Sequence, residues 1–417
     1  MAILIACRDC AAIQQLPPPP RPGRLECWNC GRVLESTVGR SLDAALACSV
    51  ATLLLLFPAT FLSGLTVHIA GATQSTRLFS GILELWREGW PLTAVALGLF
   101  GIALPFAHFA LLSATLAAIR SGVRGPWVGA AFRHCETLDL WAMSDVLLIG
   151  AGIGYGRVAS QTRVDVDAGG WCLVAAAMMT MLTRATLERR AIWRRLEVPP
   201  SEAGPDSVAC ASCELVLPPG LEGQRCPRCT APIHRRQPRA FVRCAALTAA
   251  TWVLAPIAYG YPMSQFWRAG VSKSHTVIDG VLLLFQNGFW FFGVVIFLVS
   301  VVFPFTKLVG LTWFLLSIHR GWSGRPRLKT ELYRFVDGVG RWSVLDPFTV
   351  MVFTPMVQLG QLGHFRIMGG SEAFLATVVL SMLAARAFDP RLMWDVARPG
   401  GAVANGGSAA ARAAVAA

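Results

Sequence analysis

The sequence predicts an all-α polytopic membrane protein built as a tandem duplication. Each half is expected to carry a small four-cysteine zinc ribbon followed by about four transmembrane helices. Three observations predict this fold: long apolar blocks, four Cys-x-x-Cys pairs and an internal repeat. Of the 417 residues, 54% are hydrophobic and 15% are charged, whereas soluble domains carry about 25% charged residues. The mean hydropathy is +0.52.

The apolar blocks have the length of membrane spans. About 20 apolar residues are enough for a helix to cross the hydrocarbon core of a bilayer. Because backbone polar groups in lipid must be satisfied within the segment, each block is expected to be helical. The eight expected spans are Leu46–Val67, Pro91–Ile119, Trp141–Ala159, Trp171–Leu187, Ala245–Tyr261, Gly288–Ile318, Val344–Leu362 and Ala373–Phe388.

Composition divides the chain into five expected parts. They are an N-terminal zinc ribbon (1–40), a four-helix membrane domain (41–200), a second ribbon (201–240), a second four-helix domain (241–398) and a tail (399–417). The tail is rich in Gly and Ala and has no apolar period, so we expect it to be disordered.

Basic residues gather on one side of the expected membrane. The connections that follow the second, fourth, sixth and eighth spans are rich in arginine, and the opposite connections are not. By the positive-inside rule, both termini and the central ribbon are expected to be cytoplasmic. The net charge of +13 is then expected to contact an anionic lipid leaflet rather than nucleic acid.

Eight of the twelve cysteines predict two metal sites. Two Cys-x-x-Cys pairs together offer four thiolates, the ligand set of a closed tetrahedral zinc site without a catalytic position. A ribbon this small has no sufficient core, so the metal would supply its folding free energy. Structural disulfides and a redox dithiol are the alternatives, and a cytoplasmic location disfavours the first. The expected ligands of the two zinc ions are Cys7, Cys10, Cys27 and Cys30 in the first ribbon, and Cys210, Cys213, Cys226 and Cys229 in the second.

The two halves align at a nearly constant offset. An offset of 199 residues (304 − 105) maps Pro105 onto Pro304, and one of 201 (346 − 145) maps Asp145 onto Asp346. Such a long match indicates a duplication. Because each half has an even number of expected spans, the repeats should be parallel.

Three sequence strings carry a resemblance to a known family: Trp141-Ala-Met-Ser-Asp145, Arg341-Trp-Ser-Val-Leu-Asp346 and the segment from Ala385 to Asp395. With the ribbons, they make the chain similar to the paraquat-inducible protein A family over nearly its whole length. The resemblance implies a bacterial inner-membrane lipid transport component, which loads or extracts phospholipid to or from an MCE-domain partner that spans the periplasm. It therefore implies a non-enzyme.

One ionisable side chain is expected in the middle of a span. Lys307 follows Pro304 by three residues, at a depth where a charge costs about 2.5–3.5 kcal/mol on insertion scales. Asp346 begins the next span. Its expected depth in the membrane differs from that of Lys307, so a direct ion pair would require the two helices to be staggered. A cavity shared by both groups, wet or holding a phosphate, is one explanation. The other explanation is that the Lys307 side chain reaches the interface and that Asp346 only starts a helix.

The remaining pathway candidates have simpler alternatives. Asp145 is also explained as a helix-start residue, and His108, at the position equivalent to Lys307, as a satisfied interior histidine. Thr306 is a polar neighbour of Lys307. Pro105 and Pro304 each free a carbonyl one turn back and are expected to permit a kink.

The loops on the extracytoplasmic side carry two kinds of signal. Ser80–Glu88 and Asp279–Gln286 are each expected to form a short amphipathic helix at the membrane interface. The alternation in Arg163–Gly170 predicts a short strand.

Three functions compete at this point. The first is the lipid transport component. The second is a membrane redox protein that uses the Cys-x-x-Cys pairs, although no haem-ligand histidine pairs are evident. The third is a zinc-responsive small-solute transporter. The sequence has no Gly-x-x-x-x-Gly-Lys-Ser/Thr loop, so we expect no direct use of ATP.

The arginine asymmetry yields a test of topology. Cysteines placed at Thr73 and Ser274 should react with an impermeant thiol reagent from outside the cytoplasmic membrane. Cysteines at Ser201 and Ser323 should react only after permeabilisation, because they lie in arginine-rich connections. External labelling at Ser201 would reverse the orientation.

Overall fold

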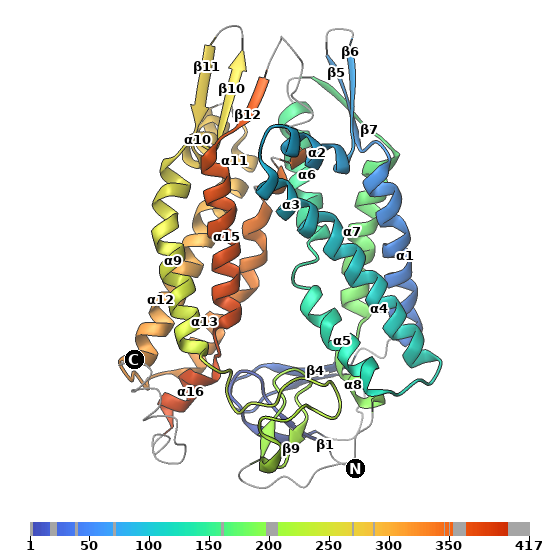
Figure 1. The fold of residues 1–417 in the computed structure, drawn as a ribbon, viewed down its shortest axis with the longest axis vertical. Coiled ribbons are helices and arrows are strands. Elements are labelled where there is room, and N and C mark those ends of the chain that lie inside the picture. Colours follow the sequence, from blue (N-terminus) through green and yellow to red (C-terminus); the bar gives the residue numbers. More distant parts are fainter. Residues whose placement is uncertain are drawn as a thin grey trace.

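The computed structural model describes residues 3–16, 23–37, 41–69, 72–159, 162–196, 207–268, 271–286, 288–345, 347–349, 351–352 and 364–398. A helical body separates two small four-cysteine ribbons at one end from two three-stranded sheets at the other (Figure 1). We call these ends the ribbon side and the sheet side. The predicted tail, 399–417, lies outside the described residues.

The membrane part consists of two equivalent sets of elements. The first set is α1 (Leu42–Phe61), β5 (Leu65–Ile69), β6 (Ala72–Thr76), α2 (Leu78–Arg87), α3 (Pro91–Gly98), η1 (Leu99–Ala103), α4 (Leu104–Arg120), α5 (Pro126–Leu138), α6 (Ser144–Ala159), β7 (Arg163–Val166), α7 (Ala168–Thr186) and α8 (Arg189–Arg195). The second is α9 (Ala240–Gly260), β10 (Ser264–Arg268), β11 (Val271–His275), α10 (Val277–Gln286), α11 (Trp290–Phe297), η3 (Leu298–Val302), α12 (Phe303–His319), α13 (Pro326–Val339), η4 (Gly340–Val344), β12 (His364–Ile367), α15 (Gly369–Ala387) and α16 (Arg391–Ala397).

The two sets confirm the tandem duplication. The start of α10 follows that of α2 by 199 residues (277 − 78), and the start of β12 follows that of β7 by 201 (364 − 163). In the first half α1 packs against α4 and α7, and in the second α9 packs against α12 and α15. Each half is therefore a bundle of three long helices with shorter elements at its ends (Figure 1).

Five described helices are long and apolar enough to cross a membrane: Leu42–Phe61, Pro91–Arg120, Ala240–Gly260, Trp290–His319 and Gly369–Ala387. The bent pair of α7 and α8 makes a sixth if it is one span. The chain is thus a multi-pass membrane protein, as predicted. The expected first span was too long at its end, because α1 stops at Phe61 and the β-branched run after Gly64 forms β5.

The expected third span is shorter than predicted. The helix α6 has 16 residues and starts at Ser144, because Asp139–Trp141 forms a turn that precedes it. The chain still returns to the sheet side there, since β7, which follows α6, pairs with β5, which follows α1. The expected seventh span lies largely outside the described residues.

The sheet side carries two equivalent three-stranded sheets, with strand orders β6-β5-β7 and β11-β10-β12. Both are antiparallel, and Leu65 pairs with Thr76 on one side and with Val166 on the other. The strand expected near Arg163 is confirmed as β7, whereas the two hairpins were not predicted. The two expected amphipathic helices are confirmed as α2 and α10.

The long middle helix of each half contains a π-helical turn before its proline. The N–H of Leu104 bonds to the carbonyl of Leu99, and that of Phe303 to the carbonyl of Leu298, five residues earlier in each case. Proline has no N–H for the carbonyl one turn back, and a wider turn accommodates this loss. The helix continues through the turn as one 30-residue element in each half.

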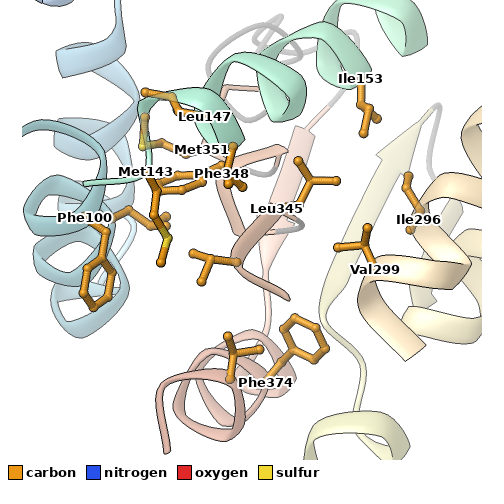
Figure 2. Packing of buried hydrophobic residues seen from close by; sticks show 14 of the residues in the cluster. Phe100, Met143, Leu147, Ile153, Ile296, Val299, Leu345, Phe348, Met351 and Phe374 are labelled. Carbon is orange, nitrogen blue, oxygen red and sulfur yellow. The ribbon is translucent and has the colours of Figure 1, made fainter. Parts of the chain in front are cut away.

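The two halves meet at a close helix crossing. The helix α6 packs against residues 345–352, which we call the crossing segment and of which 346 and 350 are not described. A Cβ at Gly150 would lie 3.1 Å from the Cβ of Phe348, and the nearest atom to a Cβ at Gly154 would be 3.6 Å away on Val352. Glycines spaced by four residues let two helix backbones approach closely. Leu147, Phe348 and Met351 surround this contact in the central apolar cluster (Figure 2).

This crossing predicts different effects for two neighbouring glycines. Gly150→Val should destabilise the fold by about 1–3 kcal/mol, because the added methyl groups overpack the crossing. Gly152→Val is the matched control, since a Cβ at Gly152 meets nothing within 4 Å. Thermal unfolding in detergent measures both. Equal midpoints for the two variants would show that the crossing is not tightly packed in the membrane protein.

Candidate functional site

Each ribbon brings its four cysteine sulfurs together in a buried cluster. The Sγ atoms of Cys7 and Cys30 are 3.5 Å apart, and those of Cys10 and Cys27 are 3.6 Å apart. The second ribbon repeats these distances, 3.5 Å for Cys210–Cys229 and 3.6 Å for Cys213–Cys226. Within each group all four sulfurs lie within 4.8 Å of one another.

The backbone of the Cys-x-x-Cys turns explains this arrangement. In every turn the N–H of the residue four positions after the first cysteine bonds to that cysteine's carbonyl, as Gly31 does to Cys27. This fifth residue has a positive φ in all four turns: Ala11, Gly31, Glu214 and Thr230. An L-residue at positive φ costs free energy, which the surrounding structure must compensate. Metal binding is such a compensation, since it is coupled to folding in small ribbons.

The sulfur spacing fits a tetrahedral metal ion. Metal–thiolate bonds of about 2.3 Å place the corners of a tetrahedron about 3.8 Å apart, close to the observed spacings. The same spacings are far longer than a disulfide bond of about 2.05 Å. Two four-cysteine groups, one in each ribbon, are thus arranged to bind metal ions.

The ribbons are exchanged between the halves. The first ribbon comprises β1 (Ile3–Ala6), β2 (Ile13–Leu16), β3 (Gly23–Glu26) and β4 (Val33–Thr37), and it packs against the second half. There Trp394 of α16 joins its apolar cluster. Arg334 of α13 donates to Asp9 at 2.7 Å and to the Sγ of Cys30 at 3.1 Å.

The second ribbon packs against the first half in the equivalent way. It contains β8 (Val208–Ala209) and β9 (Val216–Leu217). Its cysteines share an apolar cluster with Phe132 of α5 and Trp193 of α8. A Cβ at Gly129 of α5 would overlap the carbonyl oxygen of Arg228, so this contact requires glycine. The ribbons also contact each other, because Ile5 bridges to Leu215.

Ion pairs hold this assembly together at its centre. Arg8 of the first ribbon pairs with Glu214 of the second at 2.7 Å and with Glu136 of α5 at 3.7 Å. Burial, and secondly the nearby guanidinium of Arg189, lower the pKa of Arg8 to about 10. Arg8 therefore remains a cation at neutral pH.

A second candidate site lies between the halves, in the membrane part. Lys307 is 1% exposed, and its Nζ donates to Ser381 Oγ at 3.1 Å and to the carbonyl of Gly340 at 3.3 Å. It borders a cavity of about 350 Å³, which we call the polar cavity. The lining residues are Leu140, Trp141 and Asp145 from the first half, and Lys307, Asp337, Gly338, Gly340, Trp342, Met382, Ala385 and Arg386 from the second.

The structure therefore brings Asp145 and Lys307 to one cavity. Asp145 accepts a hydrogen bond from Arg184 at 2.7 Å, and Arg184 also bonds to Asp139 at 3.0 Å. The sequence had instead suggested Asp346 as the group that shares a cavity with Lys307, and Asp346 lies outside the described residues. Arg386 and Asp337 were not among the predicted site residues. Neither stands out in the sequence, because Arg386 ends an apolar block and Asp337 lies in a charged connection.

The other predicted residues occupy positions near these sites. His108 lies at the position equivalent to Lys307 and bonds through Nδ1 to the carbonyl of Cys135 at 3.1 Å, with Asp139 3.8 Å from Nε2. Pro105 and Pro304 are buried beside the π-helical turns. Thr306 is half-buried and does not line the polar cavity.

Comparison with known proteins reveals extended similarity. A curated relative, "Lipophilic envelope-spanning tunnel protein A" of Escherichia coli K12, is 27% identical over 95% of this chain and 92% of its own length. "Intermembrane transport protein PqiA" of the same organism is 24% identical over 94% of this chain and 95% of its own. A "Probable intermembrane transport protein" of Haemophilus influenzae is 23% identical over 94% and 96%. No solved structure matches significantly.

The family model that matches covers most of the membrane part. It is described as paraquat-inducible protein A, and it matches twice, at residues 42–197 and 241–398. The two matches coincide with the two equivalent halves of the structure. The chain belongs to the paraquat-inducible protein A family.

Proposed function

We propose that this protein is a lipid transport component of the bacterial inner membrane, which loads or extracts phospholipid to or from a periplasm-spanning MCE-domain partner. The relatives' names, which refer to intermembrane transport and an envelope-spanning tunnel, support transport between membranes. The partner follows from the family resemblance. In this proposal the protein positions its cargo and catalyses no covalent reaction.

The polar cavity is the observation that carries this proposal. Lys307 lies 17 residues from the start of its 30-residue helix and 12 from the end (307 − 290 and 319 − 307), so it is deep in the membrane. Asp145, Asp337 and Arg386 line the same cavity. Ionisable residues inside a membrane are expensive and usually mark a pathway for substrate or protons. Lys307 is the one of these four in the middle of a span; Asp145 and Arg386 lie in terminal turns of their helices, and Asp337 lies on α13, outside the candidate spans. Together they give either a phosphate headgroup or a proton a polar path from the helix ends to Lys307.

The orientation follows from the charges of the connections. We propose that the ribbon side, with both termini, is cytoplasmic, because the arginine-rich connections lie there. The sheet side then faces the periplasm, where a partner would dock. We also propose that 1–40 and 201–240 are metal-dependent units distinct from the membrane domains 41–200 and 241–398.

A redox function is disfavoured by the ribbon geometry. All eight ribbon cysteines are buried, and a four-thiolate site leaves no open coordination position. We propose zinc as the resident metal, because four thiolates in a tetrahedron favour it. The zinc would hold each ribbon folded.

Metal analysis tests the ribbons. Purified protein should contain about two zinc ions per chain, and Cys226→Ser should lower this by about one. The variant should also loosen the second ribbon from α5, which increased proteolysis within 207–237 would reveal. Fewer than one metal ion per chain after anaerobic purification without chelators would exclude the zinc sites, and iron would reopen the redox function.

Substitutions at the polar cavity test the transport proposal. Lys307→Ala should abolish lipid-dependent outer-membrane integrity while the protein level and zinc content stay near normal. The reason is that an apolar residue would insert into the membrane more favourably than Lys, so stability does not explain the charge. Detergent sensitivity of complemented cells measures the function.

The matched control is the equivalent residue of the other half. His108→Ala should have the milder effect, because His108 does not line the polar cavity. Lys307→Leu separates charge from shape. Full lipid transfer by Lys307→Leu would show that no charge is needed at this depth, and equal loss of protein level and activity in Lys307→Ala would assign Lys307 to folding.

A further inference from the structure

A second cavity lies on the sheet side of the first half and has a different chemistry. It has a volume of about 190 Å³ and is lined by α1, α6, α7, the sheet and the crossing segment. We call it the apolar pocket. Its lining is apolar apart from a few polar groups, among which are Arg77, Thr76 and Tyr155; the apolar residues include Ala59, Leu148, Leu173 and Met351.

Small residues create this pocket. A Cβ at Gly152 of α6 would meet nothing within 4 Å, and a Cβ at Gly64 would meet only ordinary contacts at 3.7 and 3.8 Å. The second half differs at the position equivalent to Gly64. There Met263, 199 residues later (263 − 64), immediately precedes β10 and is buried in the central apolar cluster. At this position the second half therefore carries a large side chain where the first half has none.

The mouth of the pocket is at the level of the membrane interface. Arg77 lies between β6 and α2 and is exposed, and it forms no ion pair with the described carboxylates. The helix α2 that follows exposes an apolar stripe, Phe79, Leu83 and Trp86. A helix of this kind lies in the interface plane. Arg77 immediately precedes this helix as its N-cap residue, which places its guanidinium among lipid headgroups.

The depth of the pocket is that of the acyl chains. Leu148 precedes Tyr155 by seven residues on α6, which is about 10 Å along the helix axis. The pocket therefore extends from the interface into the hydrocarbon layer. Engineered apolar cavities of about 150 Å³ stay dry and take up apolar guests. An empty pocket would lose dispersion contacts along its walls, and an alkyl chain restores them.

We propose that the apolar pocket binds one acyl chain of a phospholipid from the sheet-side leaflet, with Arg77 at its phosphate. The cation at the mouth and the apolar depth match the two parts of one phospholipid. This inference rests on the proposed function, because it names a resting place for the same cargo. It also gives the first half a lipid site of its own, separate from the polar cavity.

Photo-crosslinking tests this site directly. The full-length protein is reconstituted in phosphatidylethanolamine–phosphatidylglycerol vesicles with a phosphatidylglycerol that carries a diazirine in one acyl chain. After irradiation, modified peptides should map to 148–155 of α6 and 169–174 of α7. Gly152→Phe fills the pocket and should lower this labelling at least about fivefold. Labelling that is unchanged in a folded Gly152→Phe variant would overturn the proposal.

Three further variants keep the test decisive. Gly280→Phe is the matched control, because Gly280 is also a helical glycine with nothing within 4 Å of its Cβ, and it should label normally. If Gly152→Phe does not fold, Gly64→Met, which copies the second half, takes its place. Arg77→Gln should weaken labelling by the phospholipid probe but not by a diazirine fatty acid. Undiminished labelling of Arg77→Gln by the phospholipid probe would reject Arg77 as the partner of the phosphate.

Failure of the pocket and failure of the transport proposal give different results. Pocket labelling in a protein that transfers no phospholipid would leave the pocket standing as a lipid site and reject the transport function. Normal transfer by Gly152→Phe together with unchanged labelling would reject the pocket and leave the transport function standing.

Discussion

The close crossing of α6 with the crossing segment is the contact on which the membrane part depends. Gly150 and Gly154 allow the two backbones to approach, and this approach joins the halves near the sheet side. The same short helix has one end at the polar cavity, through Asp145, and the other at the apolar pocket, through Tyr155. The charged cavity therefore lies at the first turn of α6, and the apolar pocket lies along the rest of the helix from Leu148 to Tyr155. A longer α6, as the sequence had suggested, would have replaced the turn that holds Asp139 near Arg184.

A second constraint acts at the ribbon side. Each ribbon is folded around its own four cysteines and packs its apolar side against the opposite half, while Arg190 and Arg194 of α8 also bond the first ribbon to the first half. The equivalent tryptophans, Trp193 and Trp394, make equivalent contacts with different ribbons. The halves are thus tied at both ends, by glycine contacts on one side and by exchanged ribbons on the other. The polar cavity lies between these two ties, so a movement that changes it has to bend or release one of them.

The sequence was sufficient to predict the architecture, but not to predict which elements the ribbons and the ionisable side chains contact. Cysteine spacing identified both ribbons, and the repeat identified the two halves, because both signals are local or periodic. The boundary of α1 was misplaced, since an apolar strand such as β5 continues the hydropathy of the helix before it. The spacing of Gly150 and Gly154 indicates a close helix contact, but the pattern alone does not identify the segment that packs there. The exchange of the ribbons, and the position of Asp145 and Lys307 at one cavity, depend on residues far apart in the sequence. A periodic pattern therefore cannot predict them.

The exchange of the ribbons has a consequence for synthesis. Cys30 leaves the ribosome 364 residues before Trp394 (394 − 30), and Trp394 belongs to the last described helix. At about 5–20 residues per second, this interval is roughly 20–70 s. During that time the first ribbon can bind its metal and contact α8, where Arg194 pairs with Glu35, but its partners on α13 and α16 do not yet exist. The second ribbon emerges after α5 and α8 and can dock at once. An early stop in translation therefore leaves the first ribbon in contact with the first half alone, without α13 and α16.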